Sequence, residues 1–307
     1  PLTIENQIYF PKFIDFPDGH LQPRLDRASL FGIHSASFDT EQTPLPVDDL
    51  FIKVYADTNT NNKTQFVLTS SIASVDSLTS SFYEDVYDNN PWTFAVRIKP
   101  REYPFASAVT SSDLFDFEFY GVSYDSGIKT HEFSASAEIR LDQLIDYDVG
   151  TFLTGSNKRL YLGADRENIT GALNYHSNVR LMSSRVWYDY VKNEELQNHA
   201  RDIETFGRKH PYQNSFIYEV AENDNYIPRI DTLALHWDFA NITGSSTAGK
   251  FLVQDITSGS STAMFDEFRR RFSAGSYYDL VGRNYSGQGA GFTADSTKVV
   301  DFLFVDT

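Results

Sequence analysis

The sequence predicts a mainly β protein, built as a sandwich or a barrel, and three observations support that prediction. Short segments rich in β-branched and aromatic residues recur along the chain, turn-forming residues separate them, and no long helical repeat intervenes. Evenly spaced short strands of this kind are typical of stacked or closed antiparallel sheets. The clearest strand candidates are DLFIKVYA (49–56), TQFVLTSS (64–71), WTFAVRIKP (92–100), FDFEFYGVSY (115–124), HEFSASAEIRL (131–141) and KRLYLGA (158–164).

A further strand candidate runs directly into a short helix. From Arg185 to Val191 the side chains alternate between two faces, as in a strand. Asn193 is the expected N-cap, and Glu194 and Glu195 fall in the first turn, where carboxylates suit the positive end of the helix dipole. Because a helix this short is unstable alone, we expect it to pack on a sheet.

The chain divides into three predicted regions. Residues 1–24 are rich in proline and aromatic residues and predict an extended arm, because proline is poor in central strands. Residues 25–215 carry most strand candidates and predict one sandwich domain, whereas residues 216–307 predict a smaller β-rich module. In that module we expect a hairpin of two strands (231–239 and 250–256), a short helix (264–272) and a last strand (297–307).

Composition and charge narrow the classes of function. The 307 residues are 41% hydrophobic and 15% aromatic, which is enough to build a sizeable core. The formal net charge of −16 argues against a nucleic-acid partner, since meeting phosphates needs a basic face. There is no cysteine, so disulfides, thiolate metal sites and cysteine nucleophiles are excluded. No apolar run approaches the roughly 20 residues of a membrane span, so no membrane insertion is expected.

Several longer phrases resemble known families. A strand ending in glycine, a loop, a strand of the form R-V-W-Y and a short E-E-L helix resemble the closing signature of a laminin G-like, concanavalin A-like jelly roll. Other phrases resemble, in the same order, large virion structural proteins of tailed phages, particularly of marine cyanobacterial myoviruses, over about residues 80–260. The phrases are NKRLYLGADRENITG with NVRLMSSRVWYDYVKNEEL for the first, and FYEDVYDNNPWTFAVRIKPREYP, DFEFYGVSYDSG, NHARDIETFGRKHPY, YIPRIDTLALHWDF and GKFLVQDITSGSS for the second.

This resemblance implies a fold and a setting. The implied fold is a concanavalin A-like (laminin G-like) β-sandwich jelly roll over residues 25–215, with the smaller C-terminal β module and a few short helices. The implied setting is a phage virion, with other virion proteins and copies of the chain itself as partners. The sequence departs from the family after about residue 260. A carbohydrate-binding module of a secreted or surface protein, holding host-surface polysaccharide, is the alternative reading.

The acids of DLFDFEFYG are the nearest approach to a catalytic pair. Retaining glycoside hydrolysis needs two carboxyl groups close together across the scissile bond, and Asp116 and Glu118 share one strand face. Asp113, three residues earlier, would point the other way, and the order of the acids is reversed relative to the E-x-D-x-x-E motif of concanavalin A-like glycanases. We therefore expect no enzyme. A glycoside hydrolase using Asp116 and Glu118 is the weakest alternative.

The turn DTNTNNK offers a candidate calcium site. Asp57, Asn59 and Asn61 place oxygen ligands at alternate positions, like the start of a calcium-binding loop. Such a loop then needs Gly and Glu where this chain has Asn62 and Leu68, so a polar hairpin turn is the expected structure. No cofactor is expected, and a calcium ion at the rim of the jelly roll is the alternative.

Aromatic residues are the candidates for a sugar contact, because pyranose rings stack on flat side chains. Trp187 lies inside a strand and is expected to belong to the core, although we keep it as a ligand candidate. Tyr277 and Tyr278 lie in a stretch rich in glycine and serine and are the better surface candidates. Neighbours on one strand point to opposite faces, so only one of these two tyrosines would stack on a given ligand.

Overall fold

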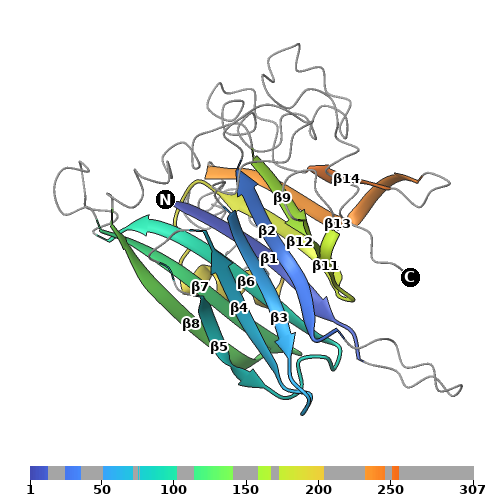
Figure 1. Cartoon of the computed structure of the whole chain (residues 1–307). Coiled ribbons are helices and arrows are strands. Elements are labelled where there is room, and N and C mark those ends of the chain that lie inside the picture. Colours follow the sequence, from blue (N-terminus) through green and yellow to red (C-terminus); the bar gives the residue numbers. More distant parts are fainter. Residues whose placement is uncertain are drawn as a thin grey trace, which may run out of the picture.

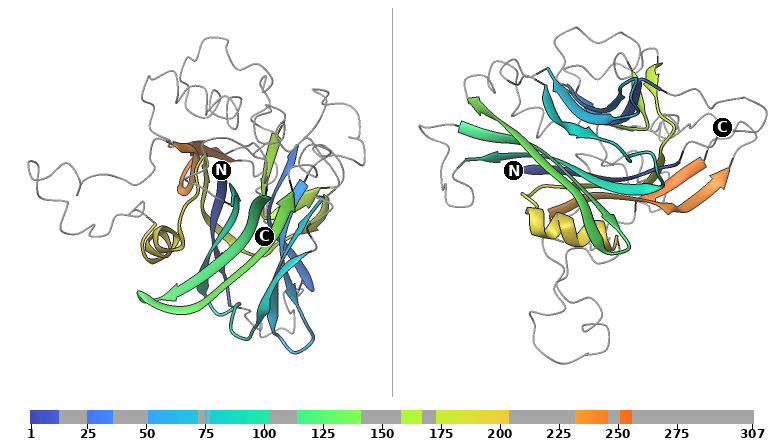
Figure 2. Two further views of the ribbon diagram at one scale, coloured as in Figure 1. Left: turned by 90° about the vertical axis from the view of Figure 1, so that its left-hand side faces the viewer. Right: turned by 90° about the horizontal axis from the view of Figure 1, so that it is seen from below.

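Two antiparallel sheets, packed face to face, make up most of the described part of the chain (Figure 1, Figure 2). In spatial order the larger sheet consists of β14 (Phe251–Asp255), β13 (Leu233–Ser245), β12 (Arg180–Trp187), β1 (Leu2–Phe10), β6 (Asn90–Pro100), β7 (Leu114–Asp125) and β8 (Ile128–Arg140). The smaller sheet consists of β5 (Leu78–Tyr83), β4 (Thr64–Ser70), β3 (Phe51–Thr58), β2 (Arg27–Ser35) and β9 (Lys158–Leu162). This computed structural model describes residues 1–12, 25–35, 51–71, 75, 77–101, 114–140, 158–166, 173–203, 232–245 and 251–255.

The predicted fold class is confirmed. The strand candidates at 49–56, 64–71, 92–100, 115–124 and 131–141 correspond to β3, β4, β6, β7 and β8. The chain crosses between the two sheets and returns beside its own first strand, where β1 pairs antiparallel with β12. That connectivity is the one expected of a jelly-roll β-sandwich. A short ribbon of β10 (Ala164–Arg166) and β11 (Leu173–His176) lies against β2 of the smaller sheet.

The first ten residues correct the expectation of an extended arm over residues 1–24. Leu2–Phe10 forms β1, which lies between β12 and β6 in the middle of the larger sheet. Pro1 precedes this strand and the other prolines of the region begin at Pro11, immediately after it, so none of them interrupts its ladder. Leu2, Ile4 and Ile8 alternate toward the core and are buried. Residues 13–24 lie outside the described part of the chain.

The predicted hairpin beyond residue 216 is present, but it belongs to the larger sheet. β13 pairs with β12, with Trp237 opposite Ser184 and Leu235 opposite Val186, and β14 pairs with β13. The boundary expected at residue 216 therefore separates neighbouring strands of one sheet and not two independent units. The helix expected at 264–272 and the strand expected at 297–307 lie outside the described residues.

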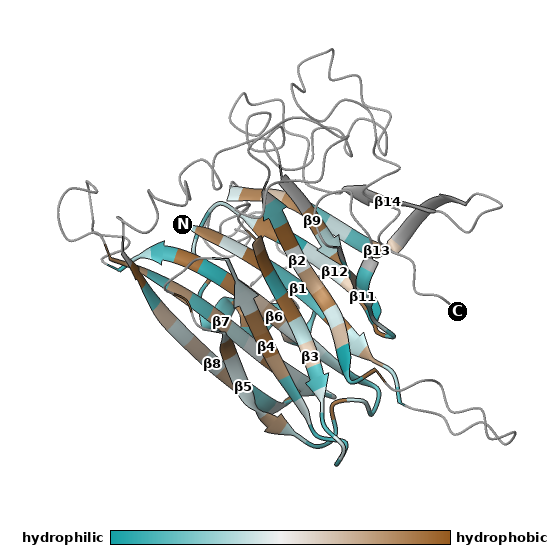
Figure 3. Cartoon of the chain, in the orientation of Figure 1, coloured by the Kyte–Doolittle hydropathy of each residue, from teal (hydrophilic) through white to brown (hydrophobic). Residues whose placement is uncertain are grey.

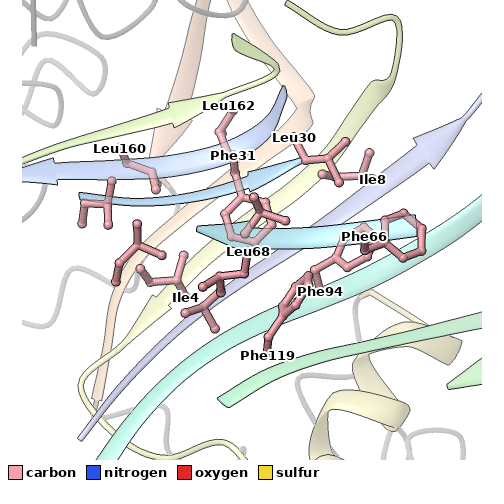
Figure 4. Close-up of a cluster of buried hydrophobic side chains, with 14 of the residues drawn as sticks. Ile4, Ile8, Leu30, Phe31, Phe66, Leu68, Phe94, Phe119, Leu160 and Leu162 are labelled. Atoms are coloured by element: carbon pink, nitrogen blue, oxygen red, sulfur yellow. The ribbon is translucent and has the colours of Figure 1, made fainter. Parts of the chain in front are cut away.

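The inter-sheet core, defined as the buried residues between the two sheets, is rich in aromatic side chains. Phe94 is fully buried, and its ring centroid lies 4.7 Å from that of Phe66 and 5.8 Å from that of Trp92. Burying a side chain of this size contributes about 1.5–3 kcal/mol. Hydropathy alternates along the strands as such a core requires (Figure 3). Figure 4 shows side chains of both sheets meeting there: Ile4, Ile8, Phe94 and Phe119 from one sheet, and Leu30, Phe31, Phe66, Leu68, Leu160 and Leu162 from the other.

The predicted helix is α3 (Asn193–Arg201), and it packs on the outer face of the larger sheet (Figure 2). Its N-cap is Lys192, whose backbone N–H donates to the Glu195 carboxylate over 2.8 Å, so Asn193 is the first helical residue and not the cap. The Asn193 amide oxygen instead accepts a hydrogen bond of 2.7 Å from Arg97. Among the described residues, no helix is long and apolar enough to cross a membrane.

Candidate functional site

The outer face of the larger sheet carries a ladder of opposite charges. Cationic side chains of β6 lie directly across from carboxylates of β7, with Arg97 opposite Glu118 and Lys99 opposite Asp116. A guanidinium nitrogen of Arg97 lies 2.8 Å from Glu118 Oε2, and Lys99 Nζ lies 3.4 Å from Asp116 Oδ2. Arg101 also contacts Asp116, at 3.3 Å. Asp116 and Glu118 thus share a face, as predicted, but each is held by a cation.

Tyr190 covers the middle of this ladder. Its hydroxyl donates to Glu118 Oε2 over 2.9 Å, and its ring lies over both Arg97 and Lys99, with cation–centroid distances of 4.8 and 4.7 Å. Burial raises the pKa of Tyr190 to about 12, with Arg97 opposing and Glu118 adding to the rise. A neutral phenol and two cations therefore surround Glu118. Asp113, the third acid of the motif, lies outside the described residues.

Beneath α3 lies a second set of charged and polar side chains, which we call the helix-side layer (Glu5, Arg185, Trp187, His199 and His236). Glu5 is buried; it accepts from His199 Nδ1 over 2.9 Å and from Trp187 Nε1 over 3.1 Å, and an Arg185 nitrogen lies 3.8 Å away. Burial alone would raise the pKa of Glu5. His199, Arg185 and the Trp187 hydrogen bond outweigh it and lower that pKa to about 2. Glu5 is therefore a buried carboxylate at neutral pH.

A serine and a histidine meet in this layer without forming a nucleophile–base pair. Ser183 Oγ lies 3.4 Å from His236 Nε2, but Arg185 Nε donates to the same Nε2 atom over 3.3 Å. That nitrogen is therefore already an acceptor for a permanent cation. Burial and the nearby Arg185 charge lower the pKa of His236 well below its ordinary value. The arrangement makes His236 a structural acceptor and leaves it poorly placed to activate the serine hydroxyl.

A third group lies on the outer face of the smaller sheet, and we call it the tyrosine–arginine patch (Arg27, Tyr55, Asp57 and Tyr175). The Arg27 guanidinium binds the Asp57 carboxylate through two hydrogen bonds of 2.7 and 2.6 Å. It lies 4.9 Å from the ring centroid of Tyr55 and 5.8 Å from that of Tyr175. Tyr175 is 41% exposed, so the patch presents a flat ring to solvent beside a half-exposed ion pair.

The ring of Tyr55 is fixed from below. Its hydroxyl donates to Asp165 Oδ2 over 2.9 Å, and Lys53 Nζ lies 2.9 Å from the other oxygen of that carboxylate. Burial, followed by Asp165, raises the pKa of Tyr55. Since Tyr175 packs edge to face on Tyr55, with centroids 5.8 Å apart, its orientation is set by a residue that is itself held in place.

The calcium candidates form a turn. Asp57 is the partner of Arg27, and the Asn59 side-chain oxygen accepts from the backbone N–H groups of Asn61, at 2.9 Å, and Lys63, at 3.0 Å. Asn62 takes a positive φ of 62°, which turns the chain between β3 and β4. In the described part of the chain, no three His, Asp or Glu side chains gather as they would at a metal site. An ion at this turn stays a prediction.

The aromatic ligand candidates fall in two places. Trp187 is 1% exposed and stacks on His199 with ring centroids 5.8 Å apart, so it is a wall of the helix-side layer and not a surface platform. The alternating strand predicted the burial of Trp187 correctly. Because the ring is buried, Trp187 is not a surface residue on which a ligand could stack. Tyr277 and Tyr278 lie outside the described residues.

The residues that sequence reasoning missed come together from distant parts of the chain. Arg27 and Tyr175 belong to β2 and β11, and Glu5 and His199 belong to β1 and α3. No local motif joins either pair. The sequence carries no local signal for Glu5, because it lies on the polar face of the alternating segment LTIENQIYF, with Thr3 and Gln7, where a solvent-exposed carboxylate would show the same pattern.

Comparisons with known proteins reveal only remote likenesses. No family model and no curated protein matches the chain. Among solved structures, a native heptameric SAP-like pentraxin from Limulus polyphemus is 10% identical over 65% of this chain and 69% of its own, with a TM-score of 0.31. Scytalido-glutamic peptidase, solved with a peptide-based transition-state analogue, is 6% identical over 61% of this chain and 74% of its own, with a TM-score of 0.24. With identities and TM-scores this low, neither likeness bears on the function of this chain.

Proposed function

We propose that the chain is a non-catalytic structural component of a tailed-phage virion, whose β-sandwich makes assembly contacts with copies of itself and with other virion proteins. The setting comes from the phrases over about residues 80–260 that resemble virion proteins of tailed phages. A second part of the proposal is attachment to host-surface polysaccharide.

One observation carries the non-catalytic part. Asp116 and Glu118 are the acids that would serve a glycoside hydrolase, and both are held by cations of β6. Retaining cleavage needs two carboxyl groups that both face the scissile bond. Arg97 and Lys99 instead occupy one oxygen of Glu118 and one of Asp116, and the Tyr190 hydroxyl also donates to Glu118. These acids therefore suit the role of counter-ions that join β6 and β7.

The tyrosine–arginine patch favours the attachment part. Saccharides are commonly held by a flat aromatic ring beside groups that both donate and accept hydrogen bonds. Tyr175 offers the ring, Arg27 offers donors and Asp57 offers acceptors, and the side chains of both charged partners remain partly exposed. This patch takes the role that Trp187 cannot take because it is buried.

The virion role is tested on particles. Tailed phages purified from lysates of the host should yield peptides of this chain by mass spectrometry, and antibodies against the purified chain should label the particles in electron micrographs. Particles whose digests contain no peptide of the chain, and which stay unlabelled, overturn the virion role.

Attachment is tested separately on a glycan array. Wild-type chain should bind at least one polysaccharide, and Tyr175→Ala should lose that binding. Phe82→Ala is the matched control, because it removes another exposed ring, 48% exposed, from β5 of the same sheet. A blank array for the wild-type chain, or equal binding by Tyr175→Ala, rejects attachment through the patch and leaves the assembly role to the particle experiment.

A further inference from the structure

The larger sheet ends at a long strand whose outer edge is exposed. β8 is the last strand in the sheet order, and its described ladder runs along β7 alone. It spans 13 residues without proline. Ser134, Ser136 and Glu138 are exposed on the outer face of this strand, and no further strand pairs with it among the described residues. An exposed edge of this length is a template for pairing with another strand.

The hydrogen-bond pattern identifies the backbone groups that face outward. Arg101 N–H donates to the Leu114 carbonyl oxygen over 3.0 Å, so the backbone groups of Leu114 face β6 and those of Phe115 face β8. Pro100, opposite Phe115, has no N–H, which agrees with this alternation. Phe115 lies opposite Ile139. From His131 to Ile139, where the register with β7 is unbroken, the odd-numbered residues of β8 therefore bond to β7.

From Glu132 to Glu138, the even-numbered residues of β8 consequently direct their N–H and C=O groups toward the open edge. An independent contact agrees, because the Tyr83 hydroxyl, from β5 of the other sheet, donates to the Glu132 carbonyl oxygen over 3.3 Å. The Tyr83 hydroxyl therefore already binds the Glu132 carbonyl oxygen, the first outward-facing group of this edge. The groups of Ser134, Ser136 and Glu138 follow it, with no partner strand among the described residues.

The side chains along this part of the edge do not block pairing. The tract Phe133–Ala137 reads FSASA and contains neither charge nor proline, the two devices that usually blunt an edge strand. Ala135 and Ala137, on the inner face, are half-buried rather than buried. A second strand laid against β8 would cover them without meeting a large side chain.

We propose that the occupant of this edge is β8 of a second copy, paired antiparallel about a two-fold axis at Ser136, so that the two larger sheets join into one. In this register Ser134 lies opposite Glu138, Ala135 opposite Ala137 and Phe133 opposite Ile139. The sequence also sets Arg140 opposite Glu132, which are opposite formal charges. Moving the axis to Ala135 would lose the pairing of Glu132 with Arg140 and set Glu132 opposite Glu138, two acids that already contact Lys129 and Arg101 of their own chain.

The inference rests on the assembly role proposed above and names its surface and its partner. A symmetric contact of this kind is self-complementary, since each copy presents the same edge to the other. Backbone hydrogen bonds supply the attraction, and the charges of the two chains oppose it. Each copy carries a formal net charge of −16, so we expect pairing to strengthen as added salt screens the repulsion.

Sedimentation equilibrium of the full 307-residue chain tests the pairing, at roughly 0.15 M and about 1 M salt. Wild-type chain should dimerise, more strongly at the higher salt concentration. Ser136→Lys places two cations together at the two-fold axis and should weaken dimerisation at least about tenfold. Ser81→Lys is the matched control, because Ser81 is an exposed serine of β5, the edge strand of the other sheet, and its dimerisation should equal that of the wild type.

A second variant separates loss of pairing from loss of folding. Ser136→Pro removes an N–H that faces the edge, so it spares the β7–β8 ladder and should abolish dimerisation while preserving the circular dichroism spectrum. The proposal is overturned if the wild type stays monomeric at about 100 μM in both salts. It is also overturned if both Ser136 variants fold and dimerise as the wild type does. Particles that lack the chain would overturn the virion role without changing any of these outcomes.

Discussion

The inter-sheet core and the helix-side layer lie on opposite faces of the same strands and are built from different chemistry. On β1, Ile4 points into the aromatic core, and its neighbour Glu5 points toward α3. Both residues are buried, at 2% and 4% exposure. The difference is that burial itself stabilises Ile4, whereas burial of Glu5 opposes its charge and must be offset by partners.

This comparison indicates what each face contributes. Apolar contacts between the sheets are largely insensitive to pH, but a smaller side chain there leaves a cavity and lowers the free energy of unfolding. A buried ion pair adds little net stability in place of apolar packing, but removing one partner is costly because the other is left unpaired. We infer that the core supplies most of the free energy of unfolding and that the helix-side layer fixes where α3 docks.

The largest expected effect comes from the core. Phe94→Ala should lower the free energy of unfolding by about 3–5 kcal/mol, because it removes a fully buried ring that lies among Phe66, Trp92 and Phe119. Urea denaturation measures the loss. Phe82→Ala, which truncates a ring 48% exposed, is the control and should change that free energy by less than about 0.5 kcal/mol. Equal losses in the two variants would mean that the aromatic cluster is not the main source of stability.

The next effect comes from the helix-side layer. Glu5→Gln keeps the shape of the side chain but removes its charge, which leaves Arg185 buried beside a neutral amide. We expect the free energy of unfolding at pH 7 to fall by about 3 kcal/mol. Proteolysis of native chain should also reach α3 sooner, because His199 loses a carboxylate partner. If the variant is as stable as the wild type, the layer is not held together by its charges.

The Glu5 carboxylate also makes the stability of the wild type depend on pH in the acid range. The pKa of Glu5 in the folded chain is about 2, below its unfolded value of 4.5, so its contribution is complete above pH 4.5 and is lost as the pH falls toward 2. The folded pKa of His236 is also lowered, so protonation of the unfolded chain begins to cost stability as the pH falls below 6.5. Urea midpoints measured across this range should fall less steeply between pH 4.5 and 2 in Glu5→Gln. If the urea midpoints of the wild type and of Glu5→Gln fall equally steeply between pH 4.5 and 2, the lowered pKa of Glu5 is contradicted.

Sequence reasoning succeeds where one strand carries its own signal. Phe66 and Phe94 lie in alternating strands that predict their burial, and the E-E-L segment predicts α3. The first strand is not predicted, because the prolines that follow Phe10 mask a regular alternation over the nine residues before them. Asparagine is a good N-cap, so the sequence predicts Asn193 as the cap, but Arg97, 96 positions away, binds that side chain.

The candidate sites were less predictable for a physical reason. Partners such as Glu5 and His199, 194 positions apart, meet only after the sheet has formed and the helix has docked on it. The tyrosine–arginine patch likewise joins β2, β3 and β11, whose register no local spacing encodes. Patterns along the chain specify which face a residue occupies, and tertiary pairing specifies its neighbour.

A smaller effect tests the packing at the edge of the core. A Cβ added to Gly121 would lie 2.2 Å from the Phe133 ring, so Gly121→Ala should cost about 1–3 kcal/mol of unfolding free energy. Phe133→Leu in the same chain should recover part of that loss by withdrawing the ring. Gly127→Ala is the control: its position has a φ of +82° and open space, so Phe133→Leu should recover nothing there. Equal recovery at both sites would refute a steric cause.

The smallest expected effect lies at the exposed end of the charge ladder. Arg101 contacts Asp116 at 3.3 Å and also reaches Glu138, but its side chain is 41% exposed, whereas that of Arg97 is 1% exposed. Water solvates both partners of an exposed pair in the unfolded and the folded chain alike, so their attraction adds little. Arg101→Ala should therefore leave the urea midpoint at neutral pH unchanged within error. A shift as large as that of Glu5→Gln would show that the exposure of an ion pair does not determine how much it contributes to stability. The difference between the core and the helix-side layer would then need a cause other than burial.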